Sequence, residues 1–216
     1  MGAQPLTGRW LVVVDFDGTI TEHDTLDLLC HRHAPVESDA ADAALLAGEI
    51  TLDECIRRQF EAIRGDHDEL VAEAVAGAGV RAGFAGFVEA ARAAGHRVVI
   101  VSSGFESVIR PVLESVGLAD LEVVASEVRF SPEGGRVEFP QTPVCERCGE
   151  RCKRPLVSAL DGSGPVVYIG DGWSDRCAAL AADRRFARES LARYLDGEQV
   201  EYVRFDDFDV IREELL

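Results

Sequence analysis

Residues 12–21 read VVVDFDGTIT, and the rest of the chain repeats their pattern of an apolar run followed by polar side chains. An extended chain points alternate side chains the same way, so Asp15 and Asp17 share one side and Phe16 takes the other. Gly18 allows a sharp exit from the strand. Two carboxylates at one strand end repel each other unless a cation or a proton offsets their charge. An ordinary acidic turn with an N-cap residue has the same sequence, so this pair alone leaves both interpretations open.

Similar apolar runs recur along the chain, with helix-like sequence between them. They span residues 10–14, 98–101, 121–125 and 166–169. Such runs are typical of parallel strands covered on both faces. Strands that alternate with helices predict an α/β fold, with a doubly wound, mostly parallel sheet that binds ligands at the carboxyl ends of its strands. Helices that end at Gly95 and Gly117 and a β-hairpin over residues 128–140 are also expected.

About 80 residues separate the first strand from the second, far more than one crossover helix needs. Helical patterns fill this segment, at residues 26–33, 38–47, 51–63 and 66–76. Thr51 and Glu54 predict a capping box at the start of the third helix. The sequence therefore predicts a helical cap inserted at residues 22–80, with residues 1–21 and 81–216 forming the core.

A second acidic pair lies in YIGDGWSD, where Asp171 ends another buried run and Asp175 follows four residues later. Carboxylates near a helix start also serve as ordinary caps. Two acidic pairs at separate strand ends, however, predict oxygen ligands for a hard cation, most simply Mg²⁺. At a third strand end, Ser102, Ser103 and Gly104 offer a hydroxyl and backbone N–H groups that suit a phosphate, although serine and glycine are also common in turns.

Lys153 is the only lysine among the 22 lysines and arginines of the chain. It lies two residues before Pro155, and proline favours the first turn of a helix. An ammonium group at that position is repelled by the helix dipole unless an anion is near. Because ammonium and guanidinium groups are not interchangeable, a single retained lysine favours a specific contact over a solvated surface position.

The composition argues against several classes of protein. A formal net charge of −17 is unfavourable for binding nucleic acid or anionic membranes. The apolar runs are too short to cross a membrane, and the first ten residues, MGAQPLTGRW, lack the apolar stretch of a signal peptide. We therefore expect a cytoplasmic protein, and its six cysteines are expected to be reduced thiols or metal ligands.

Three of these cysteines, Cys145, Cys148 and Cys152, have the spacing C-x2-C-x3-C just before the lysine. They supply three thiolates, whereas structural zinc usually takes four ligands. The fourth could be Cys177 or a cap histidine, or the three could be reduced loop thiols. A structural Zn²⁺ site is therefore one of the open interpretations.

The elements DFDGT, SSG, Lys153 and GDGWSD, in this order, resemble the haloacid dehalogenase superfamily of phosphatases. The resemblance extends from residue 10 to about residue 211, and the helical insertion is similar to the cap of the phosphoserine-phosphatase-like subgroup. It implies that Asp15 attacks phosphorus to form an aspartyl-phosphate and that Asp17 is the general acid and base. It also implies Mg²⁺ held by Asp15, Asp171 and the backbone carbonyl of Asp17.

The same resemblance assigns the remaining polar residues. Ser102 and Lys153 would hold the phosphoryl oxygens, where catalysis depends mostly on positioning and charge. Asp175 would orient Lys153 or a metal-bound water. A compact, flexible ammonium group among carboxylates can follow the phosphoryl group as it transfers, which explains a retained lysine.

Within the superfamily, the chain most resembles the methionine-salvage phosphatases that act on 2-hydroxy-3-keto-5-methylthiopentenyl-1-phosphate. Three stretches carry this resemblance: DFDGTIT followed by Asp24, the cysteine-rich segment before the lysine, and GDGWSD followed by FARESL. Phosphoserine phosphatases carry a cap arginine that pairs with the substrate carboxylate. Gln59 stands at that position here, just after Arg57 and Arg58. The resemblance implies a small phosphorylated metabolite as partner, with Asp24, Arg57 and Arg58 as candidate substrate-binding residues.

Several alternatives remain open. Phosphoserine phosphatases and phosphocholine or phosphoethanolamine phosphatases share parts of this pattern, and the latter group also has cysteines before its lysine. A phosphotransferase would use the same core residues, because access alone selects the acceptor. A binding protein with a zinc clip on a phosphatase scaffold is the non-enzymatic alternative. The sequence makes no prediction of oligomeric state.

Overall fold

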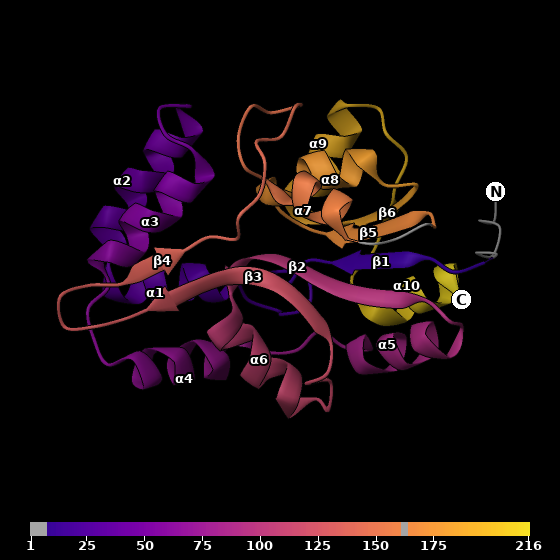
Figure 1. The fold of residues 1–216 in the computed structure, drawn as a ribbon, viewed down its shortest axis with the longest axis horizontal. Helices are drawn as coiled ribbons and strands as arrows, with labels where there is room; N and C mark the ends of the chain where they lie inside the picture. Colours follow the sequence, from indigo (N-terminus) through magenta and orange to yellow (C-terminus); the bar gives the residue numbers. More distant parts are fainter. Residues whose placement is uncertain (1–7, 161–163) are drawn as a thin grey trace.

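A computed structural model describes residues 8–160 and 164–216 (Figure 1). Residues 1–7 lie outside the described residues, and with them part of the expected core and of the stretch examined for a signal peptide. The described residues form a sheet with the strand order β4-β3-β2-β1-β5-β6-β7. The strands are β1 Leu11–Val14, β2 Arg97–Phe105, β3 Glu122–Arg129, β4 Arg136–Glu138, β5 Val166–Gly170, β6 Arg184–Ala187 and β7 Val203–Arg204.

The strand pairing confirms the predicted doubly wound, mostly parallel sheet. β1 pairs in parallel with β2 and β5, and Val14 lies opposite Ile100 on one side and Ile169 on the other. The carboxyl ends of these three strands therefore meet at one edge. The described strands contain one antiparallel pair, β3 with β4, which forms the hairpin expected over residues 128–140.

Helices cover both faces of the sheet (Figure 1). One face carries α5 Phe84–Ala93, α6 Glu106–Ser115 and α10 Phe208–Leu215, and the other carries α7 Lys153–Ala159, α8 Arg176–Ala181 and α9 Glu189–Gly197. Val12 and Val14 pack toward the first set and Leu11 and Val13 toward the second, so β1 is buried on both faces. This two-sided burial explains the wholly apolar run before Asp15.

Four more helices lie between β1 and α5, at one end of the sheet (Figure 1). They are α1 Thr25–His33, α2 Pro35–Leu46, α3 Leu52–Ala62 and α4 His67–Ala78. Their apolar side chains, such as Leu29 and Phe60, pack with Phe105 and Val128 of the sheet. The helices expected between residues 22 and 80 are present, and their separation as a cap unit stays a prediction. No helix in the described part of the chain is long and apolar enough to cross a membrane.

The start of α3 corrects one local expectation. Thr51 accepts a hydrogen bond from the backbone N–H of Glu54, which is one half of the predicted capping box. The Glu54 carboxylate does not complete the box, because it instead accepts hydrogen bonds from Arg57 and Arg58 one turn further along the helix. Two charged donors at i+3 and i+4 outcompete a single neutral N–H for this carboxylate.

Candidate active site

The polar side chains predicted at the strand ends line one pocket at the carboxyl edge of the sheet. Asp15 follows β1, Ser102 lies near the end of β2, and Asp171 follows β5. Lys153, the first residue of α7, completes this side of the pocket. The cavity measures about 230 Å³, and residues of α1, α2 and α3 form its opposite wall.

Lys153 lies between two carboxylates and is only 2% exposed. Its ammonium donates hydrogen bonds to Oδ1 of Asp15 and, at 2.6 Å, to Oδ1 of Asp175. Burial alone would lower the pKa of Lys153, but the negative charges of Asp15 and Asp175 outweigh this effect and raise the pKa above its usual value. The lysine therefore stays protonated and provides a fixed positive charge inside the pocket.

Asp175 is fully buried and fixes the position of this lysine. Its Oδ1 also accepts the hydroxyl of Tyr168 at 2.7 Å, and its Oδ2 accepts the N–H groups of Asp171 and Gly172 at 3.0 and 2.9 Å. One carboxylate thus connects Lys153, β5 and the loop after β5. The geometry is consistent with the expected orienting role of Asp175. Tyr168 was not predicted, because nothing in its apolar strand distinguishes it from a core side chain.

Asp15 and Asp171 carry more negative charge than the local cation balances. One carboxylate oxygen from each of Asp15, Asp171 and Asp175 lies within 4.8 Å of the other two. Burial and the charge of Asp175 raise the pKa of Asp15 well above its usual value, and the same two causes raise the pKa of Asp171 to about 6. An excess of buried carboxylates is the electrostatic condition that a bound divalent cation relieves.

These carboxylates fit the hard-cation site expected from the sequence. The donor set consists of oxygen atoms, as Mg²⁺ prefers. Oδ1 of Asp171 accepts the Thr19 hydroxyl at 2.9 Å, and a Cβ atom at Gly18 would lie 2.4 Å from Oδ2 of Asp171, so only glycine leaves this carboxylate its space. Because both oxygens of Asp175 are already occupied by hydrogen bonds, Asp15 and Asp171 are the better candidate ligands. The expected contribution of the Asp17 carbonyl stays a prediction.

Asp17 lies beside this pair and contacts the first residue of α1. Its Oδ1 accepts hydrogen bonds from the backbone N–H and the hydroxyl of Thr25, at 2.9 and 2.5 Å. Burial, followed by the nearby charge of Asp24, raises the pKa of Asp17 to about 7. A carboxyl group with such a pKa can both donate and accept a proton near neutral pH.

An arginine that the sequence analysis did not identify holds the loop after β1 in place. Arg81 donates hydrogen bonds to the backbone carbonyls of Gly18, Thr19 and Thr21, at 2.9, 2.8 and 2.9 Å. These partners are 60 to 63 residues away in the sequence. Because backbone carbonyls occur at every residue, no sequence motif marks such a contact.

The predicted phosphate-binding residues lie next to the lysine. Ser102, Ser103, Gly104 and Lys153 all line the pocket. Ser102 is buried, and its Oγ accepts the backbone N–H of Gly104 at 2.8 Å. This hydrogen bond leaves the hydroxyl proton of Ser102 available for an incoming oxygen. The role of these residues in binding phosphate stays a prediction.

The structure separates the predicted substrate-binding residues. Asp24 lines the pocket and caps α1 by accepting the N–H groups of Leu26 and Asp27. Arg57 and Arg58 do not line the pocket, and both are paired with Glu54.

Helical periodicity explains this separation. Residues 52, 55, 56 and 59 of α3 face the pocket, which is the spacing of one helix face, and residues 57 and 58 fall on other faces. Gln59, which lines the pocket, donates a hydrogen bond to Asp42 at 2.9 Å. The described pocket wall therefore presents Gln59 and Asp42, and neither of the two arginines that were candidates from the sequence.

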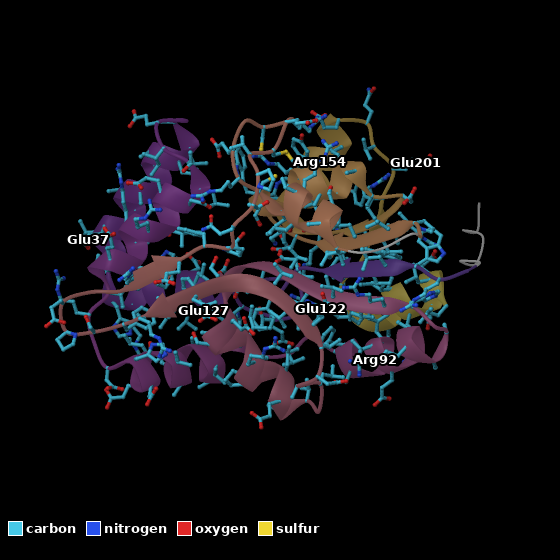
Figure 2. The ribbon with its side chains drawn as sticks, viewed as in Figure 1. Glu37, Arg92, Glu122, Glu127, Arg154 and Glu201 are labelled. Carbon is cyan, nitrogen blue, oxygen red and sulfur yellow. The ribbon has the colours of Figure 1, made fainter. Side chains whose placement is uncertain are left out.

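The cysteines form a separate group. The sulfur atoms of Cys145, Cys148, Cys152 and Cys177 lie within 4.8 Å of one another. Figure 2 shows sulfur atoms near Arg154, where the loop after β4 enters α7. Of the two fourth partners considered from the sequence, the structure brings Cys177 to the other three thiols.

Comparison with known proteins identifies the class. The haloacid dehalogenase-like hydrolase family matches residues 12–180, and the chain belongs to this family. The chain is similar to the 2-hydroxy-3-keto-5-methylthiopentenyl-1-phosphate phosphatases of Bacillus cereus, at 27% identity over 208 residues, and Bacillus anthracis, at 28% over 211 residues. Each alignment covers 94% of both chains. A solved substrate-bound phosphoserine phosphatase complex has the same fold, with a TM-score of 0.72, 17% identity, and coverage of 98% of this chain and 100% of that chain.

These findings confirm the family resemblance and the fold predicted from the sequence. The protein is a phosphatase of the haloacid dehalogenase family, a phosphoric monoester hydrolase similar to the methionine-salvage phosphatases, and it shares its fold with a phosphoserine phosphatase.

Proposed function

We propose that the enzyme hydrolyses the phosphate ester of a small metabolite, with Mg²⁺, through an aspartyl-phosphate on Asp15. The observation that carries this proposal is the buried Lys153, held between Asp15 and Asp175 in a pocket that Asp17 also lines. A permanent cation next to a buried carboxylate suits a phosphoryl group that approaches that carboxylate.

Asp15 acts as the nucleophile in this mechanism. Lys153 and the N–H of Phe16, at 2.7 Å, both donate to Oδ1 of Asp15 and orient the carboxylate. The carboxylate forms a bond to phosphorus as the ester P–O bond breaks, and Asp17 gives its proton to the leaving oxygen. Asp17 then takes a proton from water, which attacks phosphorus and releases Asp15 and inorganic phosphate.

The cation expected in this family has a defined place in the proposal. Asp15, Asp171 and the backbone carbonyl of Asp17 would hold Mg²⁺, which, when bound, offsets the charge of the carboxylates and polarises the phosphoryl oxygens. Ser102 and Lys153 would hold the other phosphoryl oxygens, and Asp175 keeps Lys153 in position.

For the substrate, we propose 2-hydroxy-3-keto-5-methylthiopentenyl-1-phosphate. The relatives that carry this name align over 94% of the chain. Among the described residues that line the pocket, Lys153 is the one basic side chain, and the proposed mechanism assigns it to the phosphoryl group. A substrate carboxylate, as in phosphoserine, would find no free cation there. An uncharged polar leaving group with an apolar end suits the leucines of the wall, such as Leu26 and Leu45.

Phosphocholine or phosphoethanolamine is the second candidate substrate. Asp24, Asp27 and Asp42 all line the pocket. Three carboxylates on the side away from the catalytic lysine suit a cationic leaving group. Both candidate substrates are compatible with Gln59 at the position where phosphoserine phosphatases carry an arginine. The two substrates differ in the charge of the leaving group.

A substrate panel tests these assignments. Phosphate release would be measured with Mg²⁺ for 2-hydroxy-3-keto-5-methylthiopentenyl-1-phosphate, phosphocholine, phosphoethanolamine and phosphoserine. We expect the highest kcat/KM for the first ester, whereas a clear preference for phosphoserine would refute the substrate proposal. Asp15→Asn, with an unchanged circular dichroism spectrum, should abolish hydrolysis of all four esters and of a generic aryl phosphate. Substantial residual turnover would refute the nucleophile.

We also propose a cytoplasmic location. The six cysteines, all within the described residues, form no disulfide, and disulfides rarely form in that compartment.

A further inference from the structure

Four cysteine sulfur atoms converge at a place outside the catalytic pocket. Cys145, Cys148 and Cys152 lie on the loop between β4 and α7, and Cys177 lies on α8. Each sulfur atom is within 4.8 Å of the others. Four sulfur atoms around a single zinc ion, each with a Zn–S bond of about 2.3 Å, would be roughly 3.8 Å apart at the corners of a tetrahedron. The observed grouping is compact enough for one metal ion.

The backbone of the loop forms a turn that is closed by hydrogen bonds at Cys145, the first of these cysteines. The N–H of Cys145 donates a hydrogen bond to the carbonyl of Glu150 at 2.8 Å. The carbonyl of Cys145 accepts the N–H of Gly149 at 2.9 Å, and Gly149 takes a φ of +75°, which glycine adopts without strain. This closed turn carries Cys145 and Cys148 and holds two of the four sulfur atoms close together.

Burial distinguishes this group from ordinary apolar packing. Cys145 and Cys177 are buried, Cys152 is half-buried, and Cys148 is exposed. A cysteine used as a small apolar residue is normally buried, as Cys30 and Cys55 are in the cap. An exposed Cys148 directed at three other sulfur atoms gains little from packing, so its position needs another explanation.

The loop also lacks regular structure to hold it. Residues 139–152 contain neither a helix nor a strand, although the residue that follows them is the catalytic lysine. Loops of about this length are uncommon in compact domains unless they are functional or otherwise fixed. A cross-link at Cys145, Cys148 and Cys152 would fix this loop at three points.

We infer that Cys145, Cys148, Cys152 and Cys177 bind one structural zinc ion. The ion displaces the thiol protons, and the four thiolates fill its four coordination positions, which leaves none for water or substrate. The spacing C-x2-C within the loop is common among structural zinc sites. Because Cys152 precedes Lys153 directly and Cys177 follows Asp175 by two residues, the site would join the two segments that carry the buried ion pair.

Metal analysis of the full-length protein tests this inference. The protein would be purified without chelators, dialysed, and measured for zinc and iron by mass spectrometry. We expect about one zinc ion per chain. Zinc well below one equivalent, or iron in its place, would overturn the assignment. Two disulfides among the four cysteines, detected as a mass loss of the unreduced denatured protein, would also overturn it.

Two matched variants separate zinc binding from folding. Cys148→Ser changes an exposed side chain and leaves no cavity, so the circular dichroism spectrum should persist while most of the zinc is lost. Cys30→Ser changes a thiol outside the group and should keep the full zinc content. If Cys148→Ser retains zinc and the unfolding temperature of the native protein, the four-cysteine site is refuted. This test measures zinc alone and does not depend on the proposed substrate.

Discussion

Replacing Asp175 by asparagine would test how the buried Lys153 is held. The Asp175 carboxylate is 0% exposed and accepts four hydrogen bonds, from Lys153, Tyr168, Asp171 and Gly172. An asparagine side chain has one oxygen acceptor, and its NH₂ group is a donor. The hydrogen-bond donors that now face one oxygen of Asp175 would therefore face the NH₂ group of the asparagine. Lys153 would keep Asp15 as its remaining carboxylate partner.

The cost follows from this loss of acceptors. Removing one partner of a buried ion pair costs about 3–5 kcal/mol. For a chain of 216 residues, each kcal/mol corresponds to a fall in Tm of about 2–4 °C, so Asp175→Asn should lower Tm by roughly 6–20 °C. Since proteins are stable by only about 5–15 kcal/mol, the variant should still fold near 20 °C unless the native enzyme lies at the low end.

Thermal unfolding followed by circular dichroism measures this effect, with urea unfolding at 20 °C as the second assay. The matched control is Glu122→Gln, at an exposed position labelled in Figure 2, which neutralises a carboxylate paired with the half-buried Arg97. An exposed pair contributes about 0–1 kcal/mol, so Tm should change by less than about 4 °C. If Asp175→Asn unfolds within 2 °C of the native enzyme, the buried network does not hold Lys153 as described.

Three further changes have defined outcomes. Asp17→Asn removes the proposed proton donor and acceptor, so steady-state kinetics should show a kcat lower by about 10²–10⁴. The loss should be smallest for an aryl phosphate, whose leaving group needs no proton. An equal loss for alkyl and aryl esters would contradict this role of Asp17. Arg81→Gln removes hydrogen-bond donors to the loop after β1, so both kcat and Tm should fall. Urea unfolding should show a free energy of unfolding lower by about 1–3 kcal/mol. An unchanged kcat would show that the loop keeps its position without Arg81. EDTA should abolish turnover and excess Mg²⁺ should restore it, whereas full turnover after exhaustive chelation would argue against a cation at Asp15 and Asp171.

The sequence predicted the central strands because their burial is recorded in their composition. β1, β2 and β5 contain apolar runs that are mostly buried, and β3 contains a shorter run that is half-buried. The last two strands, β6 and the edge strand β7, read RRFA and VR, and were not predicted. Their arginines are half-buried or exposed, so neither strand shows the pattern of a strand covered on both faces.

The catalytic edge was predictable for a topological reason. In a parallel sheet, residues that follow neighbouring strands must meet, so Asp15, Ser102 and Asp171 could be grouped before any contact was known. Arg81 could not, because it binds backbone carbonyls that carry no sequence signal. Arg57 and Arg58 were close in sequence to the position expected for a substrate-binding arginine, but one step along a helix turns a side chain by about 100°.

The hydrogen bonds from Thr25 to Asp17 have a consequence for transplanting caps between relatives. Thr25 begins the first inserted helix, whereas Asp17 belongs to the loop of the core. Exchanging the insertion therefore changes more than the pocket wall, because it also replaces the two hydrogen-bond donors of Thr25 that hold Asp17, the proposed proton donor and acceptor. A cap taken from a relative would have to bring a hydroxyl and an N–H to the same point. Chimeras that lack these two groups should hydrolyse every ester more slowly, including esters whose leaving group fits the new cap.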